Sequence, residues 1–353
     1  MTSKLSISVI LPVRNEARSL PALLWSLVRQ DFPETDFEII VADGRSTDET
    51  RDVVERLAAQ SPVTLRLVDN PGIRSGPGRN AGLHVADGEF ILFIDGHCHI
   101  PSRQLLRDTI TLFQQTQADC LCRPQPLVAH PDFPFGASIA AVRASALGHG
   151  RDSLIYDLTA TGFVDPASSG AAYRRSVFAA LGEYDECFDA CEDVEFNTRV
   201  RKSGMRAYTD PRLAIYYEPR ASLASLIKQM MRYGRGRVRL MTKHPDCISA
   251  GQLAPAFLVA AVAIAFLSLL PHTRENSWIR AALCAPALLY CTLVLLSSLG
   301  MARKSGVKFL YRAPAIYFAI HVGLGLGIWA ETFRNMKTVF ARNPAMVHRT
   351  TRS

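Results

Sequence analysis

Four short apolar runs in the first hundred residues, at 7–13, 37–41, 63–68 and 90–94, alternate with segments whose apolar residues follow helical spacing. Short runs rich in β-branched and aromatic residues are typical of strands buried on both faces of a sheet. Strands that alternate with helices form a mostly parallel, doubly wound sheet. The N-terminal part is therefore predicted to be an α/β domain.

Polar clusters follow three of these runs, at the point where each strand is expected to end. Glu16 comes shortly after the first run, Asp43 after the second and Asp95 after the fourth. Because the carboxyl ends of parallel strands meet at one edge of a sheet, these side chains should converge on one site. Open α/β sheets bind their ligands at this edge.

The cluster after the fourth run has a pattern that suits a metal ion. Side chains at alternate positions of an extended chain point the same way, so Asp95, His97 and His99 can face one cleft. Oxygen and imidazole donors of this kind fit Mn²⁺ or Mg²⁺ bound to a diphosphate. The alternative is an ordinary strand end with a solvated aspartate and two surface histidines.

Two later stretches also allow two interpretations. Residues 76–82 are glycine-rich, and their backbone could approach a phosphate with Arg79 as the counter-charge. They lack the glycine order of a dinucleotide fold and the lysine of a P-loop, so a turn is the plainer interpretation. Residues 188–196 carry four carboxylates. One of them could act as a general base, or all could be there only because carboxylates interact favourably with the dipole at the start of a helix.

The last hundred or so residues are far richer in apolar residues than the rest. Residues 222–243 form a basic amphipathic pattern, typical of a helix in a membrane interface, although a solvated helix packed on the soluble domain is the alternative. Three apolar stretches follow at 253–270, 281–299 and 313–330, near the length that spans a bilayer. The third is interrupted by His321 and by glycines, so it is either a span or a re-entrant segment.

Basic residues indicate which side of the membrane each part occupies. The loop 301–312 carries four lysines and arginines and is expected to be cytoplasmic, which agrees with a cytoplasmic N-terminal domain followed by an out-and-back hairpin. The tail after residue 330 is basic as well. If the third stretch spans, this tail lies outside, against the same tendency.

The composition narrows the partners. A formal charge of +8 and an isoelectric point of about 9.2 favour anionic partners. No zinc-finger or basic-region pattern supports nucleic acid, and the apolar C-terminal part points to a membrane instead. The eight cysteines show no zinc-binding spacing and no secretory signal pattern precedes them, so we expect reduced thiols.

The motifs between residues 5 and 240 together resemble glycosyltransferase family 2, the inverting enzymes of the GT-A fold. In chain order they are Pro12-Val13-Arg14-Asn15-Glu16, Asp43-Gly44-Arg45-Ser46-Thr47-Asp48, Gly78-Arg79-Asn80, Asp95-Gly96-His97, Gly170-Ala171-Ala172, Glu192-Asp193 and Gln229-x-x-Arg232-Tyr233. Each motif is weak alone, but their order and spacing together are specific. The Asp-Gly-His-Cys-His variant and the membrane tail look most like the bacterial succinoglycan-biosynthesis glucosyltransferases.

The resemblance implies a role for each matching position. The nucleotide-sugar would be bound by Pro12, Arg14, Glu16, Asp43, Gly44, Arg79 and Asp95. A divalent metal, Mn²⁺ or Mg²⁺, would be held by Asp95 and His97. The base that deprotonates the acceptor hydroxyl would be Asp193, helped by Glu192. The acceptor and the diphosphate would meet Gly170, Gln229, Arg232 and Tyr233.

Two departures from the family pattern matter. His97 stands where the family usually has a second aspartate, and imidazole removes one negative charge from the metal site. The family motif Gln-x-x-Arg-Trp ends here in Tyr233. Processive polymer synthases of the family carry such a motif together with a larger membrane channel. Three spans are too few for a channel, so we expect transfer of a single sugar.

The sequence therefore predicts a GT-A catalytic domain at 1–221, an amphipathic interfacial helix at 222–245 and a membrane region with a basic tail at 246–353. We expect a membrane-anchored inverting enzyme of the bacterial inner membrane, with its catalytic domain cytoplasmic. It would move one sugar, glucose, from a UDP-sugar to a polyprenyl-diphosphate-linked saccharide in exopolysaccharide synthesis. The alternatives are transfer of a phosphorylated sugar, or a nucleotide-sugar-binding membrane scaffold without catalysis.

Overall fold

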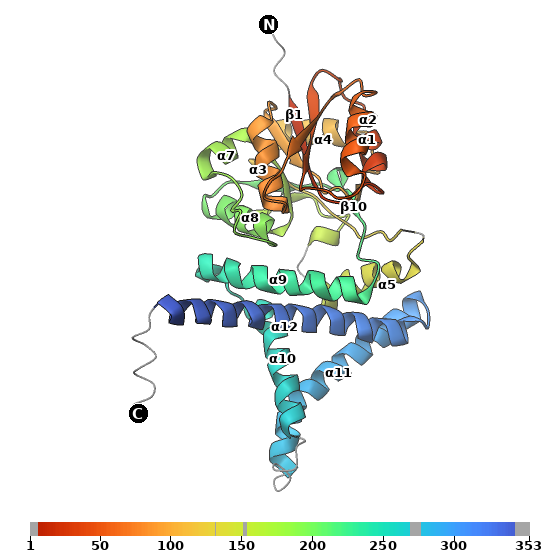
Figure 1. The fold of residues 1–353 in the computed structure, drawn as a ribbon. Helices are drawn as coiled ribbons and strands as arrows, with labels where there is room; N and C mark the ends of the chain where they lie inside the picture. Colours follow the sequence, from red (N-terminus) through yellow and green to blue (C-terminus); the bar gives the residue numbers. More distant parts are fainter. Residues whose placement is uncertain (1–5, 131, 151–153, 269–276, 343–353) are drawn as a thin grey trace. The chain divides into compact units, whose positions relative to one another are not determined.

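The computed structural model describes residues 6–130, 132–150, 154–268 and 277–342, and the chain divides into two compact units. One unit is made of residues 1–132 and 150–219, and the other of residues 133–149 and 220–353. The first unit contains the sheets, and the described elements of the second are all helices (Figure 1). The division assigns 133–149 to the C-terminal unit, although the sequence places it inside the catalytic part.

The first unit is built on an eight-stranded sheet of order β3-β2-β1-β4-β8-β6-β9-β7. Its strands are β1 Ile7–Val13, β2 Phe37–Asp43, β3 Thr64–Asp69, β4 Phe90–Phe93, β6 Cys120–Cys122, β7 Gly162–Val164, β8 Gly170–Arg174 and β9 Ala207–Thr209. Strands β1 to β4 are parallel, β8 is antiparallel to both of its neighbours, and β7 is antiparallel to β9. A small second sheet pairs β5 Cys98–His99 with β10 Tyr216–Tyr217. The predicted mostly parallel sheet is confirmed.

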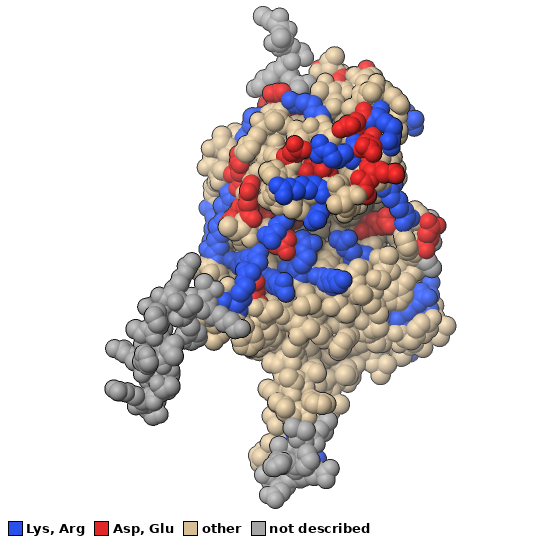
Figure 2. All heavy atoms as spheres, viewed as in Figure 1, with Lys and Arg blue, Asp and Glu red and all other residues tan. Residues whose placement is uncertain are grey.

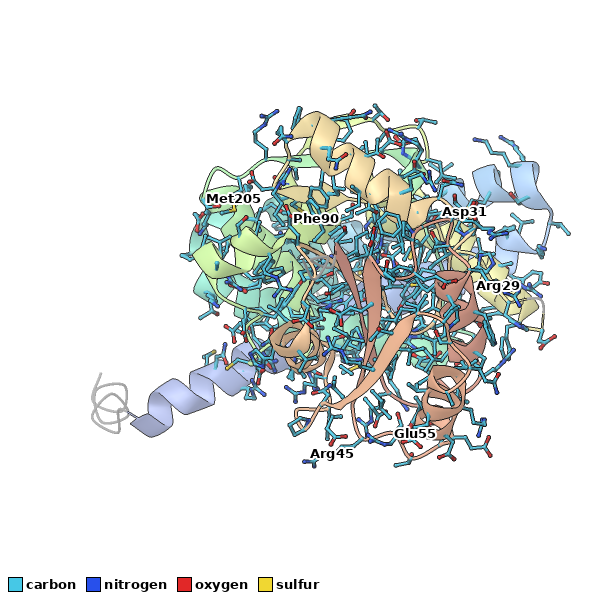
Figure 3. The ribbon with its side chains drawn as sticks, turned by 90° about the horizontal axis from the view of Figure 1, so that it is seen from above. Arg29, Asp31, Arg45, Glu55, Phe90 and Met205 are labelled. Atoms are coloured by element: carbon cyan, nitrogen blue, oxygen red, sulfur yellow. The ribbon has the colours of Figure 1, made fainter. Side chains whose placement is uncertain are left out.

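Helices cover both faces of the large sheet, as a doubly wound fold requires. Two hydrophobic cores result, one under α1 Leu20–Val28, α2 Thr50–Ala58 and α4 Leu105–Thr116, the other under α3 Ser75–Val85, α7 Arg175–Leu181 and α8 Glu192–Lys202. Short 3₁₀ turns at η1 Leu154–Tyr156, η2 Pro166–Ser168 and η3 Pro211–Leu213 connect the later strands. Seen from above in Figure 3, Phe90 at the start of β4 lies near the middle, with Met205 on one side and Arg29 and Asp31 on the other.

The carboxyl ends of the first strands are aligned. Val13 at the end of β1 pairs with Asp43 at the end of β2, which in turn pairs with Asp69 at the end of β3. Because β6 is parallel to β4 through the antiparallel β8 between them, the end of β6 lies at the same edge. We call this the carboxyl edge, and the predicted convergence of polar clusters takes place there.

Arg174 at the end of β8 and Arg175 at the start of α7 are both held by the backbone of neighbouring segments. Their guanidinium groups donate to backbone carbonyls, Arg174 to Ala118 and Phe113 and Arg175 to Gly88 and Ala86. Both arginines therefore fix the chain around the amino end of β4.

The second unit contains α5 Pro134–Arg143, α6 Ala146–His149, α9 Leu223–Lys243, η4 Pro245–Cys247, α10 Ala250–Ser268, α11 Ser277–Ser305 and α12 Phe309–Arg342. Helix α9 is the predicted amphipathic helix, and it starts at a capping box between Ser222 and Ser225. Among the residues that the structure describes, three helices are long and apolar enough to cross a membrane, over Ala250–Ser268, Trp278–Ser305 and Phe309–Met336.

Candidate active site

Two buried side-chain oxygens at the carboxyl edge, of Asp43 and Asn70, accept no hydrogen bond from the described residues. Asp43 is 1% exposed, and its Oδ2 accepts from the Ser46 amide at 3.2 Å and from Arg51 at 3.1 Å. Its Oδ1 has no hydrogen-bond partner among the described residues, and neither has Oδ1 of the neighbouring buried Asn70. A buried acceptor without a donor is costly, so this pair suits a ligand that brings N–H groups.

The backbone around these oxygens is tightly packed and strained. A Cβ atom on Gly44 would overlap the Ile73 carbonyl and lie 3.2 Å from the Val13 carbonyl. Asn15, Arg45 and Ile73 all adopt left-handed backbone angles, with φ of 56°, 56° and 69°. Such angles are unfavourable for non-glycine residues, most of all for β-branched isoleucine, and they cluster at functional sites.

Glu16 and His97, which the sequence assigned to the nucleotide-sugar and to the metal, are in contact at this edge. The Glu16 carboxylate lies 2.9 Å from His97 Nδ1 and accepts at 2.6 Å from the Ser19 hydroxyl. Ser19 occupies the N-cap position of α1, and its side chain makes no cap hydrogen bond there. The His97 ring meets Tyr217 edge-on, whereas His99 is exposed and stacks on Tyr216. The two imidazoles therefore make different contacts.

Three predicted residues from distant parts of the chain meet around one buried guanidinium. Arg79 Nη1 lies 3.0 Å from the Glu192 carboxylate, and its Nη2 lies 3.4 Å from Asp95. The guanidinium also lies against the rings of Phe93 and Tyr184, at 5.9 and 5.3 Å from their centroids. The Arg79 and Glu192 side chains are each only 10% exposed, so this ion pair is largely shielded from water.

The cluster changes the protonation equilibria of all three groups. Burial opposes the ionisation of Asp95, but Arg79, His97 and Arg123 together lower its pKa below the usual value. Burial raises the pKa of Glu192, with help from Asp193 and Asp95 and against the attraction of Arg79. Burial also opposes the charge of Arg79, yet Glu192 and Asp95 raise its pKa above the usual value. Asp95 and Arg79 thus stay charged.

Asp193 differs from its neighbour Glu192. Both belong to the first turn of α8, which follows Cys191 in a left-handed conformation with φ of 66°. Glu192 is buried against Arg79, whereas Asp193 is exposed and one of its oxygens accepts from the Val194 amide at 2.8 Å. Of the two predicted catalytic carboxylates, only Asp193 is therefore open to an incoming acceptor.

Arg123 is a residue of this edge that the sequence reasoning missed. It follows β6 directly and is 7% exposed, and its Nε and Nη1 have no hydrogen-bond partner among the described residues. Burial lowers the pKa of Arg123, while Cys98 and Asp95 oppose that change. A buried cation with unused donors next to Asp95 suits a ligand with negative charge. The rule that found Asp43 and Asp95, a polar residue at a strand end, would have found it had β6 been recognised.

The remaining predicted residues lie in different places. Pro12 borders Gly78, where an added Cβ would lie 2.9 Å from Pro12 Cβ, and Arg14 is exposed beside it in the chain. Gly170 starts β8, and a Cβ there would overlap the Asn197 side chain. Gln229, Arg232 and Tyr233 lie on α9 in the second unit, where Gln229 donates to the Tyr233 hydroxyl at 3.4 Å. Their role towards an acceptor stays a prediction.

The predicted metal ligands, Asp95 and His97, can be compared with what a divalent ion requires. Within the part of the chain that the structure describes, no three His, Cys, Asp or Glu side chains come together as a metal cage. Asp95 and His97 offer one carboxylate and one imidazole. Mg²⁺ and similar ions are often held by one or two protein ligands plus substrate phosphates and waters, so these two residues fit an ion completed by a diphosphate.

The eight-stranded sheet and its flanking helices form a fold of the GT-A type. Solved structures with this fold include a mannosyltransferase, PcManGT from Pyrobaculum calidifontis in complex with GDP-Man and Mn²⁺, with a TM-score of 0.55, 22% identity and coverage of 92% of this chain and 88% of that one. For TarS 1-349 of S. aureus in complex with UDP-GlcNAc, the TM-score is 0.50 and the identity 18%, with coverage of 94% of this chain and 92% of that one. At these identities the likeness concerns the fold.

Sequence comparison gives the family. The family model described as "Glycosyl transferase family 2" matches residues 8–182. The succinoglycan biosynthesis protein ExoA of Rhizobium meliloti is 30% identical over 336 residues, which cover 94% of this chain and 96% of the relative. A dolichyl N-acetyl-alpha-D-glucosaminyl phosphate 3-beta-D-2,3-diacetamido-2,3-dideoxy-beta-D-glucuronosyltransferase of Methanococcus voltae is 26% identical over 67% of this chain and 74% of its own length. The chain belongs to glycosyltransferase family 2, and it is a glycosyltransferase.

Proposed function

We propose that the protein is a membrane-anchored inverting glycosyltransferase that moves one sugar, glucose, from a UDP-sugar to a polyprenyl-diphosphate-linked saccharide. Its setting is bacterial exopolysaccharide synthesis at the inner membrane, with residues 1–221 as the cytoplasmic catalytic domain. The name of the ExoA relative, which matches nearly full length, supports the pathway class. The name of the archaeal relative, a transferase acting on a dolichyl-linked sugar, supports a lipid-linked acceptor.

The observation that carries the proposal is the exposed Asp193 carboxylate beside the buried chain Glu192–Arg79–Asp95. Glu192 is held in an ion pair with Arg79 and is not free to take a proton from an acceptor. Asp193 is exposed to solvent, and the ion pair of Arg79 on this turn is made with Glu192. It is therefore the carboxylate assigned to general-base catalysis, and Glu192 positions it through Arg79 and the start of α8.

The donor nucleoside is assigned to the aligned ends of β1 to β3. The N3–H group of uracil would donate to the free Oδ1 of Asp43, which has no partner among the described residues. Asn70 offers a second buried acceptor, and Gly44 lets the end of β2 pack directly against the Ile73 and Val13 carbonyls beside these acceptors. The structure of TarS with UDP-GlcNAc supports a uridine donor for this fold.

The diphosphate is assigned to the end of β4 and β6. The buried Arg123 guanidinium has two N–H groups, on Nε and Nη1, without a partner among the described residues. Charge-assisted hydrogen bonds from such groups to phosphate are stronger than hydrogen bonds between neutral groups. A divalent cation, which Asp95 and His97 would hold together with the diphosphate, supplies Lewis-acid stabilisation of the leaving group when bound. The structure of PcManGT with GDP-Man and Mn²⁺ supports such an ion in this fold.

The transfer step then follows from this arrangement. Asp193 accepts the proton of the acceptor hydroxyl as its oxygen attacks the anomeric carbon from the face opposite the diphosphate. The new glycosidic bond forms as the bond from the anomeric carbon to the phosphate oxygen breaks, so the configuration inverts. The electron pair of the breaking bond leaves on the nucleoside diphosphate, where Arg123 stabilises the growing negative charge. Gly170, Gln229, Arg232 and Tyr233 are assigned to the acceptor side.

Release of nucleoside diphosphate by the purified protein in detergent tests this function. The assay supplies a panel of nucleotide-sugars, a bacterial lipid extract and Mn²⁺ or EDTA. Release with one donor that requires lipid and is lost in Asp193→Asn is the expected result, and Asp52→Asn, an exposed acid in the first turn of α2, is the matched control. Nucleoside monophosphate as the product would indicate transfer of a phosphorylated sugar. Donor binding without any release would favour the scaffold alternative.

A further inference from the structure

Helices α9 and α12 of the second unit lie side by side and run in the same direction. A Cβ on Gly323 would lie 2.8 Å from Met230 Cβ, and one on Gly327 would overlap the Met231 carbonyl. One turn further along α9, a Cβ on Gly234 would overlap the Leu324 carbonyl of α12. The glycines therefore let the two backbones touch over several turns, and both helices share one inclination (Figure 1).

The same pairing continues through a buried ion pair. Arg239 Nε of α9 lies 2.8 Å from the Glu331 carboxylate of α12, which is 2% exposed and also pairs with Arg334. Helix α9 carries six lysines and arginines and no acidic residue. Charges at such a density keep α9 out of the hydrocarbon core of the bilayer. Because α12 runs alongside α9 over several turns, α12 does not span the bilayer either.

The side of α12 away from α9 is an exposed apolar stripe. Its members are large side chains between 41% and 65% exposed, at Tyr311, Phe318, Leu326, Phe333 and Met336. At about 100° per residue they fall within an arc of about 80°, and the residues that face α9 lie on the opposite side of the helix. We call this set the α12 stripe.

Helix α10 is attached on the side of the α12 stripe. Trp329 Nε1 donates to the Ala256 carbonyl at 3.0 Å, and a Cβ on Gly325 would overlap the Pro255 carbonyl. From there α10 and α11 continue as a hairpin, so α12 lies between α9 and the hairpin in Figure 1. The visible face of the hairpin is almost entirely uncharged in Figure 2. Only 11% of the apolar window of α10 and of α11 is buried in protein, against 56% for α12.

We propose that α12 lies in the plane of the membrane boundary, with the α12 stripe against the acyl chains and α9 on its aqueous side, and that only α10 and α11 cross the bilayer. The occupant of the stripe is the lipid itself, because the hairpin that enters the lipid starts from the same face. At about 1.5 Å per residue, the 19 residues of α10 match a hydrocarbon core of about 30 Å. Trp278, 71% exposed at the start of α11, lies where an aromatic residue meets the far interface.

Two crossings place the basic tail on the same side as the catalytic unit. The loop with Arg303, Lys304 and Lys308 and the tail after residue 330 then both face the cytoplasm and its anionic headgroups. This removes the conflict that three spans create. The inference rests on the membrane association in the proposed function and not on sugar transfer, so diphosphate release is an independent readout.

Protease protection of the full chain tests the number of crossings. One epitope precedes Met1, a second follows Ser353, and both are digested in spheroplasts and in inside-out vesicles. We expect both epitopes to be cut only in inside-out vesicles. Cutting of the two epitopes from opposite sides of the membrane would overturn the inference. Transferase activity in the same vesicles shows that the tagged chain is folded.

Depth measurements test the orientation of α12 directly. Tyr311→Trp, Phe318→Trp, Leu326→Trp and Phe333→Trp are reconstituted one at a time into phosphatidylethanolamine and phosphatidylglycerol vesicles with brominated acyl chains. An in-plane helix predicts equal shallow quenching at all four positions, measured as the increase over the parent protein. A spanning helix would instead quench the inner two strongly and the outer two weakly, because residues 318 and 326 would lie within about 7 Å of the bilayer midplane and residues 311 and 333 about 16 Å or more from it. That pattern would overturn the inference.

Discussion

Replacing Arg79 by methionine should be among the most damaging single changes in the catalytic unit. The substitution keeps an apolar stem between Phe93 and Tyr184 but removes the charge that faces Glu192 at 3.0 Å and Asp95 at 3.4 Å. Because the Arg79 and Glu192 side chains are only 10% exposed, the change leaves a buried carboxylate without its counter-charge. Breaking such a pair costs about 3–5 kcal/mol. In a unit of this size that corresponds to a loss of about 6–20 °C in melting temperature.

The pH dependence of this loss identifies its cause. Burial raises the pKa of Glu192 in the folded protein, and Arg79 works against that rise. A group with a raised pKa stabilises the fold below its unfolded pKa and loses that contribution as the pH rises through its folded pKa. Without Arg79 the pKa of Glu192 rises further. The difference between variant and parent should therefore be full at pH 8 and much smaller near pH 4.5, the ordinary pKa of this carboxyl.

Thermal unfolding of the detergent-solubilised protein at both pH values measures this difference. The matched control is Arg74→Met at the start of α3, because Arg74 is 48% exposed and its pair with Asp189 at 3.2 Å is open to water. Such a pair contributes about 0–1 kcal/mol, so the control should melt close to the parent. A melting temperature of Arg79→Met equal to that of the control at pH 8 would refute the assigned role of Arg79.

Three further predictions concern the metal, the diphosphate and the helix pair. His97→Ala should raise the metal concentration that gives half-maximal activity by about tenfold or more, and an unchanged metal titration would remove His97 from the ligand set. Arg123→Gln should raise the donor KM about ten- to hundredfold without lowering the melting temperature, since Arg123 Nε and Nη1 have no hydrogen-bond partner among the described residues. An unchanged KM would contradict this. Gly327→Ala should destabilise the helical unit because its Cβ overlaps the Met231 carbonyl, whereas Gly300→Ala on α11 has open space and should be neutral or stabilising. Equal melting temperatures for the two variants would show that the pairing of α9 and α12 is loose.

The first half of the catalytic unit was predictable because its signals are local. Strand β1 matches its predicted range, β2 extends it by two residues and β4 shortens it by one. Each of these strands is buried along its length, so an apolar run alone reports it. The convergence of Asp43 and Asp95 on one edge follows from parallel pairing. This is why the donor side of the site could be expected from the sequence.

The second half was not predictable in the same way. Strands β6, β7 and β9 have only three residues each, too short for a periodic pattern, and they pair with partners distant in the chain. Arg123 was missed for this reason. The contact of Arg79 with Glu192 spans 113 residues, and no local signal reports it.

Helix α12 illustrates a different limit of sequence reasoning. Its composition alone fits a membrane span, and the glycines that weakened this prediction proved to be the contacts with α9 and α10. The sequence showed that the segment is unusual. Only the packing of Gly323, Gly325 and Gly327 shows what the small residues are for.

The most direct test of the central claim separates donor binding from transfer in Asp193→Asn. Calorimetric titration of the purified variant with the donor found in the release assay measures binding, and nucleoside diphosphate release in the presence of lipid acceptor measures transfer. Because the substitution keeps the shape of an exposed side chain and removes only its basicity, we expect donor affinity within about twofold of the parent. Release should fall at least about a hundredfold, the contribution typical of a positioned general base. Release at the parent rate by a variant that binds donor normally would contradict the assignment of Asp193 as the base and the mechanism built on it.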